Sequence, residues 1–131
     1  MANPNIVAVS NILGGNLGWN LSATTTTTLM TVAAEKIVKI NRITVANVDG
    51  AAAADVSLFV DGLTTAGATG ISPTGASATV YLAKTISVPA DATLVISDTP
   101  IYLMEGDILK GGASAASDLD LFISYEVLDD A

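Results

Sequence analysis

Apolar and polar residues alternate most clearly near the end of the chain. Between residues 119 and 127 the odd positions hold Leu, Leu, Ile, Tyr and Val, whereas Asp120, Ser124 and Glu126 are among the even positions. A period of two places successive side chains on opposite faces of a β-strand, so this segment is predicted to be a strand with one buried face. No long window shows the spacing of three and four residues that is typical of a helix.

A second alternating segment covers residues 79–88. Its predicted buried face comprises Val80, Leu82, Ile86 and Val88. Lys84 interrupts this face, and a lysine at an otherwise apolar position indicates either a sheet edge or a side chain that extends outward to water. We therefore predict a strand whose apolar face points to the core except at Lys84.

Residues 36–48 change the parity of their apolar positions partway along the segment. Val38 and Ile40 share one parity, and Ile43 has the other. A β-bulge near Asn41 and Arg42 would return all these side chains to one core face, because a bulge inserts one extra residue into a strand. Further short strands are predicted for residues 6–13, 26–32, 56–60, 93–97, 101–104 and 107–110.

Turn residues divide the chain into short strands. Gly, Asn and Asp recur about every ten residues, which is typical of a sandwich or a barrel. Residues 105–107 are predicted to form a tight hairpin turn, and the glycines of residues 14–18 a flexible linker. The predicted fold is a single antiparallel β-sandwich domain over residues 1–131, jelly-roll-like or immunoglobulin-like, with about eight strands. Residues 1–22 are predicted to form an N-terminal arm, and residues 61–78 a long Gly/Thr/Ala-rich loop.

The composition excludes most kinds of active site. Half of the residues are apolar and 14% are charged, so the chain is expected to fold rather than remain disordered. The absence of Cys and His rules out disulfides, zinc sites built on those residues and a Ser–His or Cys–His nucleophilic pair. Asp118 and Asp120 share the outward face of their predicted strand, where solvation explains them. Alanines fill the ligand positions after Asp49 and Gly50 that a calcium loop would need. We therefore predict no enzyme activity, no catalytic residue, no cofactor and no metal.

The charge of the chain also limits its partners. Five basic residues face thirteen acidic ones, and a net charge of −8 argues against binding to nucleic acid. No apolar run approaches the ~20 residues that span a bilayer, and no basic residue precedes the first apolar stretch, so neither a membrane protein nor a secreted one is expected. Lys36, Lys39 and Arg42 lie close together, whereas most acidic residues follow Asp91. This asymmetry indicates either a solvated acidic surface or a basic strand of one copy that meets the acidic C-terminal strand of another copy.

Apolar residues in the predicted arm and loop are the candidate contact residues. Trp19 is the single tryptophan, and it either completes the core or anchors an interface. Trp19 and Leu21 lie in the predicted arm, and Leu63 and Ile71 lie in the predicted loop. We expect these four side chains to contact neighbouring copies or another protein of the same assembly, with a trimer as the favoured homo-oligomer.

A series of sequence blocks, spread over nearly the whole chain, carries a resemblance to a known family. The blocks are MANPNIV (1–7), KINRI (39–43), VANVDG (45–50), AKTISVPADATLV (83–95), IYLMEGD (101–107) and ISYE (123–126). In this order they resemble small virion structural proteins of marine tailed bacteriophages, notably phages of cyanobacteria. The resemblance implies a component of the phage particle, on the head surface or in the tail, that is made in the host cytoplasm and is not secreted.

Three functions are compatible with the sequence. The first is a capsid decoration (cement) protein, which binds the outside of the head shell as an oligomer and contacts the major capsid protein or other virion proteins. The second is a structural component of the tail, neck or baseplate. The third is a carbohydrate- or receptor-binding β-sandwich module, although a chain with one Trp, three Tyr and two Phe has few aromatic side chains for a sugar site. The decoration protein is the preferred interpretation.

Overall fold

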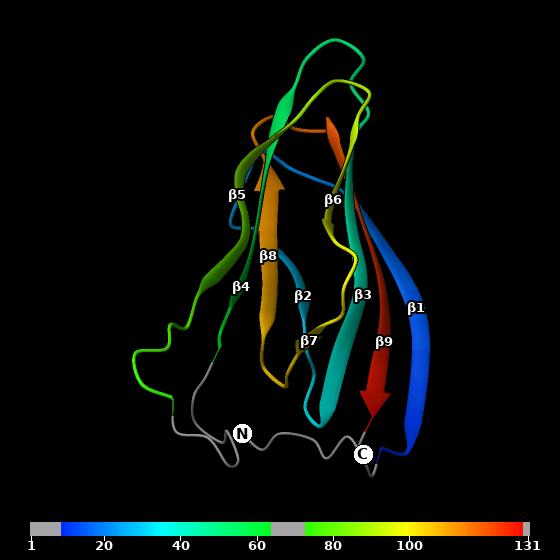
Figure 1. Ribbon diagram of the computed structural model, residues 1–131, viewed down its shortest axis with the longest axis vertical. Coiled ribbons are helices and arrows are strands. Elements are labelled where there is room, and N and C mark those ends of the chain that lie inside the picture. Colours follow the sequence, from blue (N-terminus) through cyan, green and yellow to red (C-terminus); the bar gives the residue numbers. More distant parts are fainter. Residues whose placement is uncertain (1–8, 64–72, 130–131) are drawn as a thin grey trace.

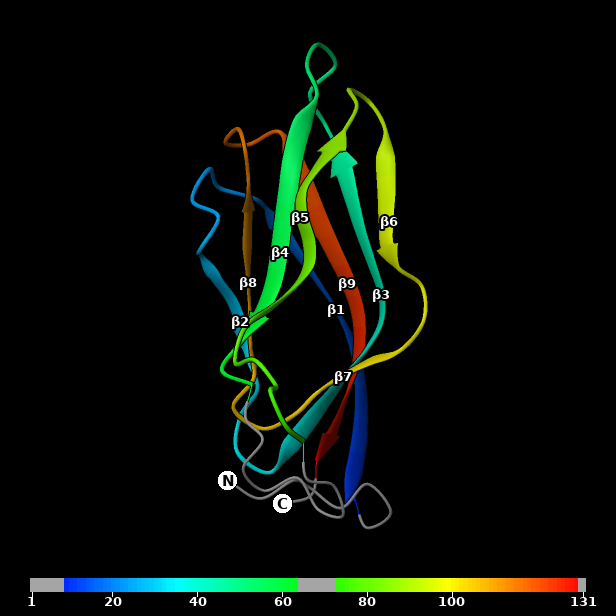
Figure 2. The ribbon, with the colours of Figure 1, turned by 60° about the vertical axis from the view of Figure 1, so that its left-hand side comes forward.

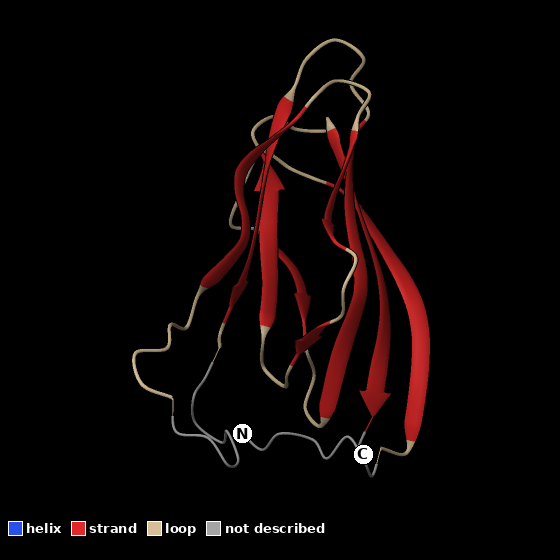
Figure 3. Cartoon of the chain, viewed as in Figure 1, coloured by secondary structure: helices blue, strands red, loops and turns tan. Residues whose placement is uncertain are grey.

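The computed structural model describes residues 9–63 and 73–129, which form nine β-strands and no helix (Figures 1 and 3). The strands are β1 (Asn11–Asn20), β2 (Thr28–Thr31), β3 (Lys36–Asn47), β4 (Ala54–Asp61), β5 (Val80–Val88), β6 (Thr93–Ser97), β7 (Ile101–Leu103), β8 (Ile108–Ala113) and β9 (Leu119–Asp129). They form two sheets that face each other (Figure 2). Sheet A has the order β1-β9-β3-β6, with β7 also paired to β3, and sheet B has the order β2-β8-β4-β5.

The strand pairs are nested within one another along the sequence. β1 pairs with β9, β2 with β8, β3 with β6, and β4 with β5, and every pair is antiparallel. The chain therefore runs as one long hairpin whose strands are distributed between two sheets, which is the arrangement of a jelly roll. The predicted all-β antiparallel sandwich is confirmed. The described residues form nine strands, compared with the predicted total of about eight, and β7 falls within the predicted strand at residues 101–104.

The core lies between the two sheets, and β3 and β9 contribute much of it. Leu119, Leu121 and Ile123 of β9 are fully buried, as the alternation in the sequence predicts. The pairing of β3 with β9 shifts between Ile40 and Arg42, so the predicted bulge is confirmed. It allows side chains on both sides of the bulge to face the same core. Ile40 before the bulge and Ile43 and Val45 after it are fully buried in this core.

The predicted core face of β5 is wrong in two of its four positions. Val80 and Ile86 are exposed, whereas Ala83 and Val88 are buried. The pairing of β4 with β5 shifts at two points, and Thr85 has a positive φ of 49°, so the simple alternation is interrupted between Ala83 and Val88. β5 does lie at a sheet edge, which is one of the two settings predicted from its lysine.

Residues 105–107 form a turn that joins the two sheets, which corrects the prediction of a hairpin. β7 before the turn belongs to sheet A, and β8 after it belongs to sheet B. Gly106 has a φ of +87°, a conformation that glycine adopts without steric cost. Asp107 accepts a hydrogen bond at Oδ2 from the Met104 backbone N–H (2.8 Å), and its own N–H donates to the Met104 carbonyl (3.0 Å). Burial raises the pKa of the Asp107 carboxyl.

The glycine-rich segment that was predicted as part of a flexible arm is a strand over most of its length. β1 pairs with β9 from Asn11 to Asn20 without a shift in register. Gly15 is opposite Tyr125, and a Cβ at Gly15 would lie 2.6 Å from the Tyr125 hydroxyl oxygen. The tyrosine side chain therefore occupies the space beside this glycine, which is how an aromatic residue compensates for a glycine on a neighbouring strand. The correction applies to residues 9–22, because residues 1–8 lie outside the described part.

Candidate interaction surface

The four edges of the two sheets differ in how well they are protected. An unpaired edge is a template for another strand, and proteins protect it by shortness, bulges or charge. On the edge of sheet A opposite β1, β6 and β7 have five and three residues. In sheet B, β2 has four residues, and β5 contains Lys84 and two register shifts. β1 has ten residues, a regular register, no proline and no charge.

β1 also exposes large apolar side chains. Ile12 is 60% exposed and Leu13 is 59% exposed, whereas Leu17 is 37% exposed. Odd positions of β1 are in register with the odd, core-facing positions of β9, so Leu13 and Leu17 lie on the core side of sheet A. Even positions, including Ile12, lie on its outer face. Sheet B leaves the core side of β1 partly uncovered, and both faces of this strand carry apolar side chains that water can reach.

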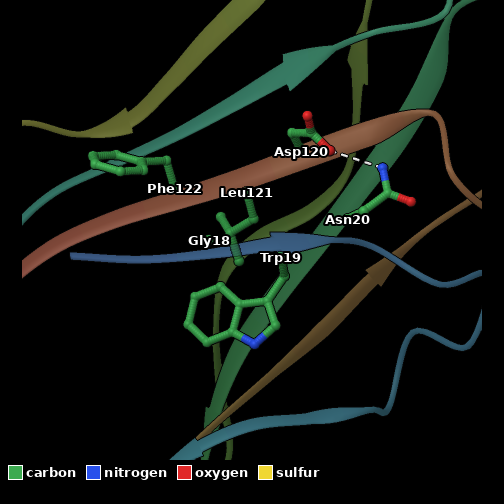
Figure 4. Close-up of a pocket in the computed structure, with 6 residues that line it drawn as sticks. All are labelled: Gly18, Trp19, Asn20, Asp120, Leu121 and Phe122. Carbon is green, nitrogen blue, oxygen red and sulfur yellow. Dashed lines mark hydrogen bonds between the residues drawn. The ribbon is translucent and has the colours of Figure 1, made fainter.

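A shallow hollow of about 300 Å³ lies where β1 meets β9 (Figure 4). The residues that line it are Gly18, Trp19, Asn20, Asp120, Leu121 and Phe122. Gly18 has no side chain to fill the space, and the Phe122 ring on the neighbouring strand is exposed. The Asn20 side-chain amide donates to Asp120 Oδ1 (2.8 Å) and to the Ser117 carbonyl (3.2 Å), so one rim of the hollow is polar and fixed in position.

The four predicted contact residues do not form one surface. Trp19 is half-buried, packs against the core from β1 and borders the hollow. Leu21 is buried in the core and is not accessible to a partner in this conformation. Leu63 is half-buried and packs against the core just after β4. Ile71 lies outside the described residues.

The exposed apolar residues of β1, namely Ile12, Leu13 and Leu17, are not among the contact residues predicted from the sequence. A signal for them was present, because apolar residues recur in a segment that contains neither charge nor proline. The glycines of residues 14–18 favoured the prediction of a flexible linker over that of a strand. Phe122 occupies an even position of β9, on the outer face of sheet A, and its ring is exposed.

The basic and acidic segments meet within a single chain. β3 and β9 are neighbours in sheet A, and Lys39 is in register with Glu126. Lys36 Nζ lies 2.9 Å from Asp129 Oδ2. The charge asymmetry therefore does not require the alternative in which the basic strand of one copy meets the acidic strand of another, and that alternative stays a prediction.

A second ion pair joins two strands of sheet B. Lys110 Nζ lies 2.8 Å from Asp61 Oδ2, and the Thr79 hydroxyl donates to Asp61 Oδ1 (2.7 Å). These two hydrogen bonds, that from Lys110 first, lower the pKa of Asp61 to about 2. Within residues 9–63 and 73–129, no three His, Cys, Asp or Glu side chains gather in a way that could hold a metal ion. The same residues contain no helix long and apolar enough to cross a membrane.

Over the described residues the chain is a two-sheet jelly roll, and β1 is the longest and least protected of its edge strands. No protein-family model matches the chain, and no curated protein matches it. Among solved structures, it is similar to a chain described under the heading of Bacillus endospore appendages that form a novel family of disulfide-linked pili. That similarity covers 92% of this chain and 88% of the other, with 13% sequence identity and a TM-score of 0.41, and it assigns neither a family nor a function.

Proposed function

We propose that this protein is a structural subunit of a bacteriophage particle, and that it decorates the outside of the head shell as a homo-oligomer. The observation that carries the proposal is the series of sequence blocks, from residues 1–7 to residues 123–126, that resemble small virion proteins. The proposal includes contact with the major capsid protein or another virion protein, in a virion assembled inside the host.

The surface of the sandwich supports a role in assembly. A subunit that is repeated many times needs surfaces that remain open until a neighbour arrives, and β1 with its hollow is such a surface. Many weak contacts then add up, because each further contact is made within an assembly that already holds the subunit in place. The net charge of −8 favours solubility before assembly.

A sugar-binding role receives less support from the positions of the exposed aromatic residues. Tyr81 lies on sheet B, and Tyr102 and Phe122 lie on two different strands of sheet A. The hollow contains Phe122 and the half-buried Trp19, which Figure 4 shows extending to different sides of β1. A sugar site requires aromatic faces and polar groups that converge on one ligand.

Quantitative mass spectrometry of purified phage particles tests the proposal. A decoration protein should be present at a copy number comparable to that of the major capsid protein, and should be removed from the shell without loss of the tail. A copy number that is a small fraction of that value would assign the chain to the tail, neck or baseplate. Absence from purified particles would contradict a virion role altogether.

A further inference from the structure

We propose that two copies of this chain associate through their β1 strands, which pair antiparallel about a two-fold axis at Gly15 and join the two copies of sheet A into one continuous sheet. This inference names the self-association surface of the subunit proposed above. It can be tested on the isolated protein, so its failure and the failure of the virion assignment are distinguishable.

The backbone of β1 supplies the main attraction. β1 is the end strand of sheet A, and no described strand pairs with the side that faces away from β9 (Figure 1). With the axis at Gly15, residues 11–19 of the two copies overlap. An antiparallel pair of this length forms about nine backbone hydrogen bonds, which is close to the number in a typical specific interface.

The core-side residues of β1 are complementary to themselves in this register. A two-fold axis perpendicular to the sheet keeps the core sides of both copies on the same side of the joined sheet. Leu13 of one copy then lies opposite Leu17 of the other, and the symmetry repeats this contact. Both side chains are exposed in the single chain, and directly opposite apolar residues stabilise an antiparallel pair.

The outer-face residues of the two β1 strands are also complementary in this register. Ile12 of one copy lies opposite Gly18 of the other copy, beside the hollow next to Phe122 (Figure 4). Ile12 is the most exposed of the large apolar side chains described, and the hollow gives it a place to pack. The pairing therefore covers the exposed apolar residues on both faces of β1 at once.

The fold of the single chain does not require a glycine at position 18. Its φ is not in the left-handed region, and a Cβ there would meet only the Leu121 carbonyl oxygen, at an ordinary contact distance of 3.7 Å. Gly14 is similar, because a Cβ there would meet no atom within 4 Å. Glycine inside a strand marks a close approach by another backbone or a ligand, and the second copy of β1 provides this approach.

The acidity of the chain does not oppose this pairing at the joint. β1 carries no charge, so no like charges are brought opposite each other. The nearest acidic strands, the two copies of β9, are separated by three strand spacings, about 14 Å. This distance exceeds the screening length of ~8 Å at physiological ionic strength.

Sedimentation velocity of the full chain over a range of concentrations tests the association. The wild type should form dimers, and Ile12→Asp should raise the dissociation constant at least about 30-fold, because the pairing would bury an unpaired charge. Val48→Asp is the matched control, since Val48 is 54% exposed and lies beyond the end of β3 rather than on β1. Circular dichroism confirms that each variant is folded. Gly18→Val, which should also weaken the dimer by filling the hollow, replaces Ile12→Asp if that variant does not fold.

Disulfide trapping tests the register, since the chain has no cysteine of its own. The double variant Leu13→Cys/Leu17→Cys should form covalent dimers rapidly. Within one strand the two sulfurs cannot meet, because four residues span about 13 Å, beyond the ~7 Å limit between bridged Cα atoms. Asn16→Cys should cross-link more slowly, and rapid cross-linking there would move the axis from Gly15 to Asn16 and contradict the proposed register.

The association itself is overturned by several results. A wild type that stays monomeric at every concentration, or that forms a trimer, contradicts pairing about a two-fold axis. An Ile12→Asp variant that is folded and still dimerises places the interface elsewhere. Dimers in the wild type and the Val48→Asp control, together with monomers in Ile12→Asp, support it.

Discussion

β1 and β9 are neighbours in sheet A, and their register is regular from the pair Asn11–Asp129 to the pair Asn20–Asp120. The two strands nevertheless differ in how far neighbouring strands enclose them. β9 lies between β1 and β3, and Leu119, Leu121 and Ile123 on its core side are fully buried. Among the described strands, β1 pairs only with β9 and therefore on one side. Leu17 of β1 is directly opposite Ile123 of β9, and Leu17 is 37% exposed whereas Ile123 is 0% exposed.

This difference shows that complete pairing along one side does not make a strand part of the interior. β9 stabilises the fold through burial, whereas β1 contributes backbone pairing to the fold and keeps its other edge for a further contact. The stability of the chain and its association should therefore respond to different residues of two adjacent strands.

The largest expected effect is on the stability of the fold, and it comes from shortening the side chain of Ile123, which lies opposite Leu17. Ile123→Ala should lower the free energy of unfolding by ~2–5 kcal/mol, because it removes methylene and methyl groups from a fully buried site. Leu17→Ala should cost about 1 kcal/mol, because that side chain is only partly buried. Ser124→Ala, on the outer face of β9, should change stability by less than ~0.5 kcal/mol. Urea denaturation measures all three, and equal losses for Ile123→Ala and Leu17→Ala would remove the distinction between the strands.

Two adjacent glycines of β1 should give effects of opposite sign. Gly15→Ala should destabilise the fold by about 1–2 kcal/mol, since the new Cβ would displace the Tyr125 ring. Gly14→Ala should stabilise it by about 0.5 kcal/mol, because nothing lies within 4 Å and the unfolded chain loses freedom. Thermal unfolding of both variants at a concentration where the protein is monomeric provides the comparison. A stabilising Gly15→Ala would show that Tyr125 does not hold β1 in place.

Lowering the pH should have the smallest effect on the free energy of unfolding, and this effect should not distinguish β1 from β9. The reason is that Asp61, whose carboxyl has a strongly lowered pKa, lies in sheet B. The pKa of Asp61 is lowered to about 2, so its contribution to stability is complete above about pH 4 and is lost as the pH falls towards 2. Asp61→Asn should therefore flatten this part of the curve of stability against pH. If the variant and the wild type lose stability in parallel over this range, the Lys110 and Thr79 contacts do not stabilise the fold.

The sequence predicts well where the pattern is local and the strand is enclosed. The alternation of β9 gives its buried residues correctly, and the change of parity in β3 gives the bulge between Ile40 and Arg42. Both strands have neighbours on each side, so an apolar side chain on the core side becomes buried. The nested order of pairs is not encoded in any single segment, which is why jelly-roll and immunoglobulin-like sandwiches could not be distinguished from the sequence.

The predictions that are wrong concern strands at sheet edges, where the burial of a side chain depends on residues that are distant in the sequence. The face of β5 changes because bulges against β4 and the positive φ of Thr85 interrupt the alternation. Residues 14–18 of β1 were expected to form a flexible linker because of their glycines, but the residue that covers Gly15 is Tyr125, far away in the sequence. Leu21 was a predicted contact residue and is instead a core residue, since it directly follows a strand that packs on β9.

Hydrogen exchange of the full chain at increasing protein concentration tests the central claim most directly, which is that β1 is an open edge in one copy and is closed by a second copy. Peptides from β1 should gain protection as concentration rises, whereas peptides from β9 should be strongly protected throughout. The Ile12→Asp variant supplies the unpaired reference, in which β1 should stay weakly protected at every concentration. Equal protection of β1 in the wild type and in this variant at all concentrations would contradict the account.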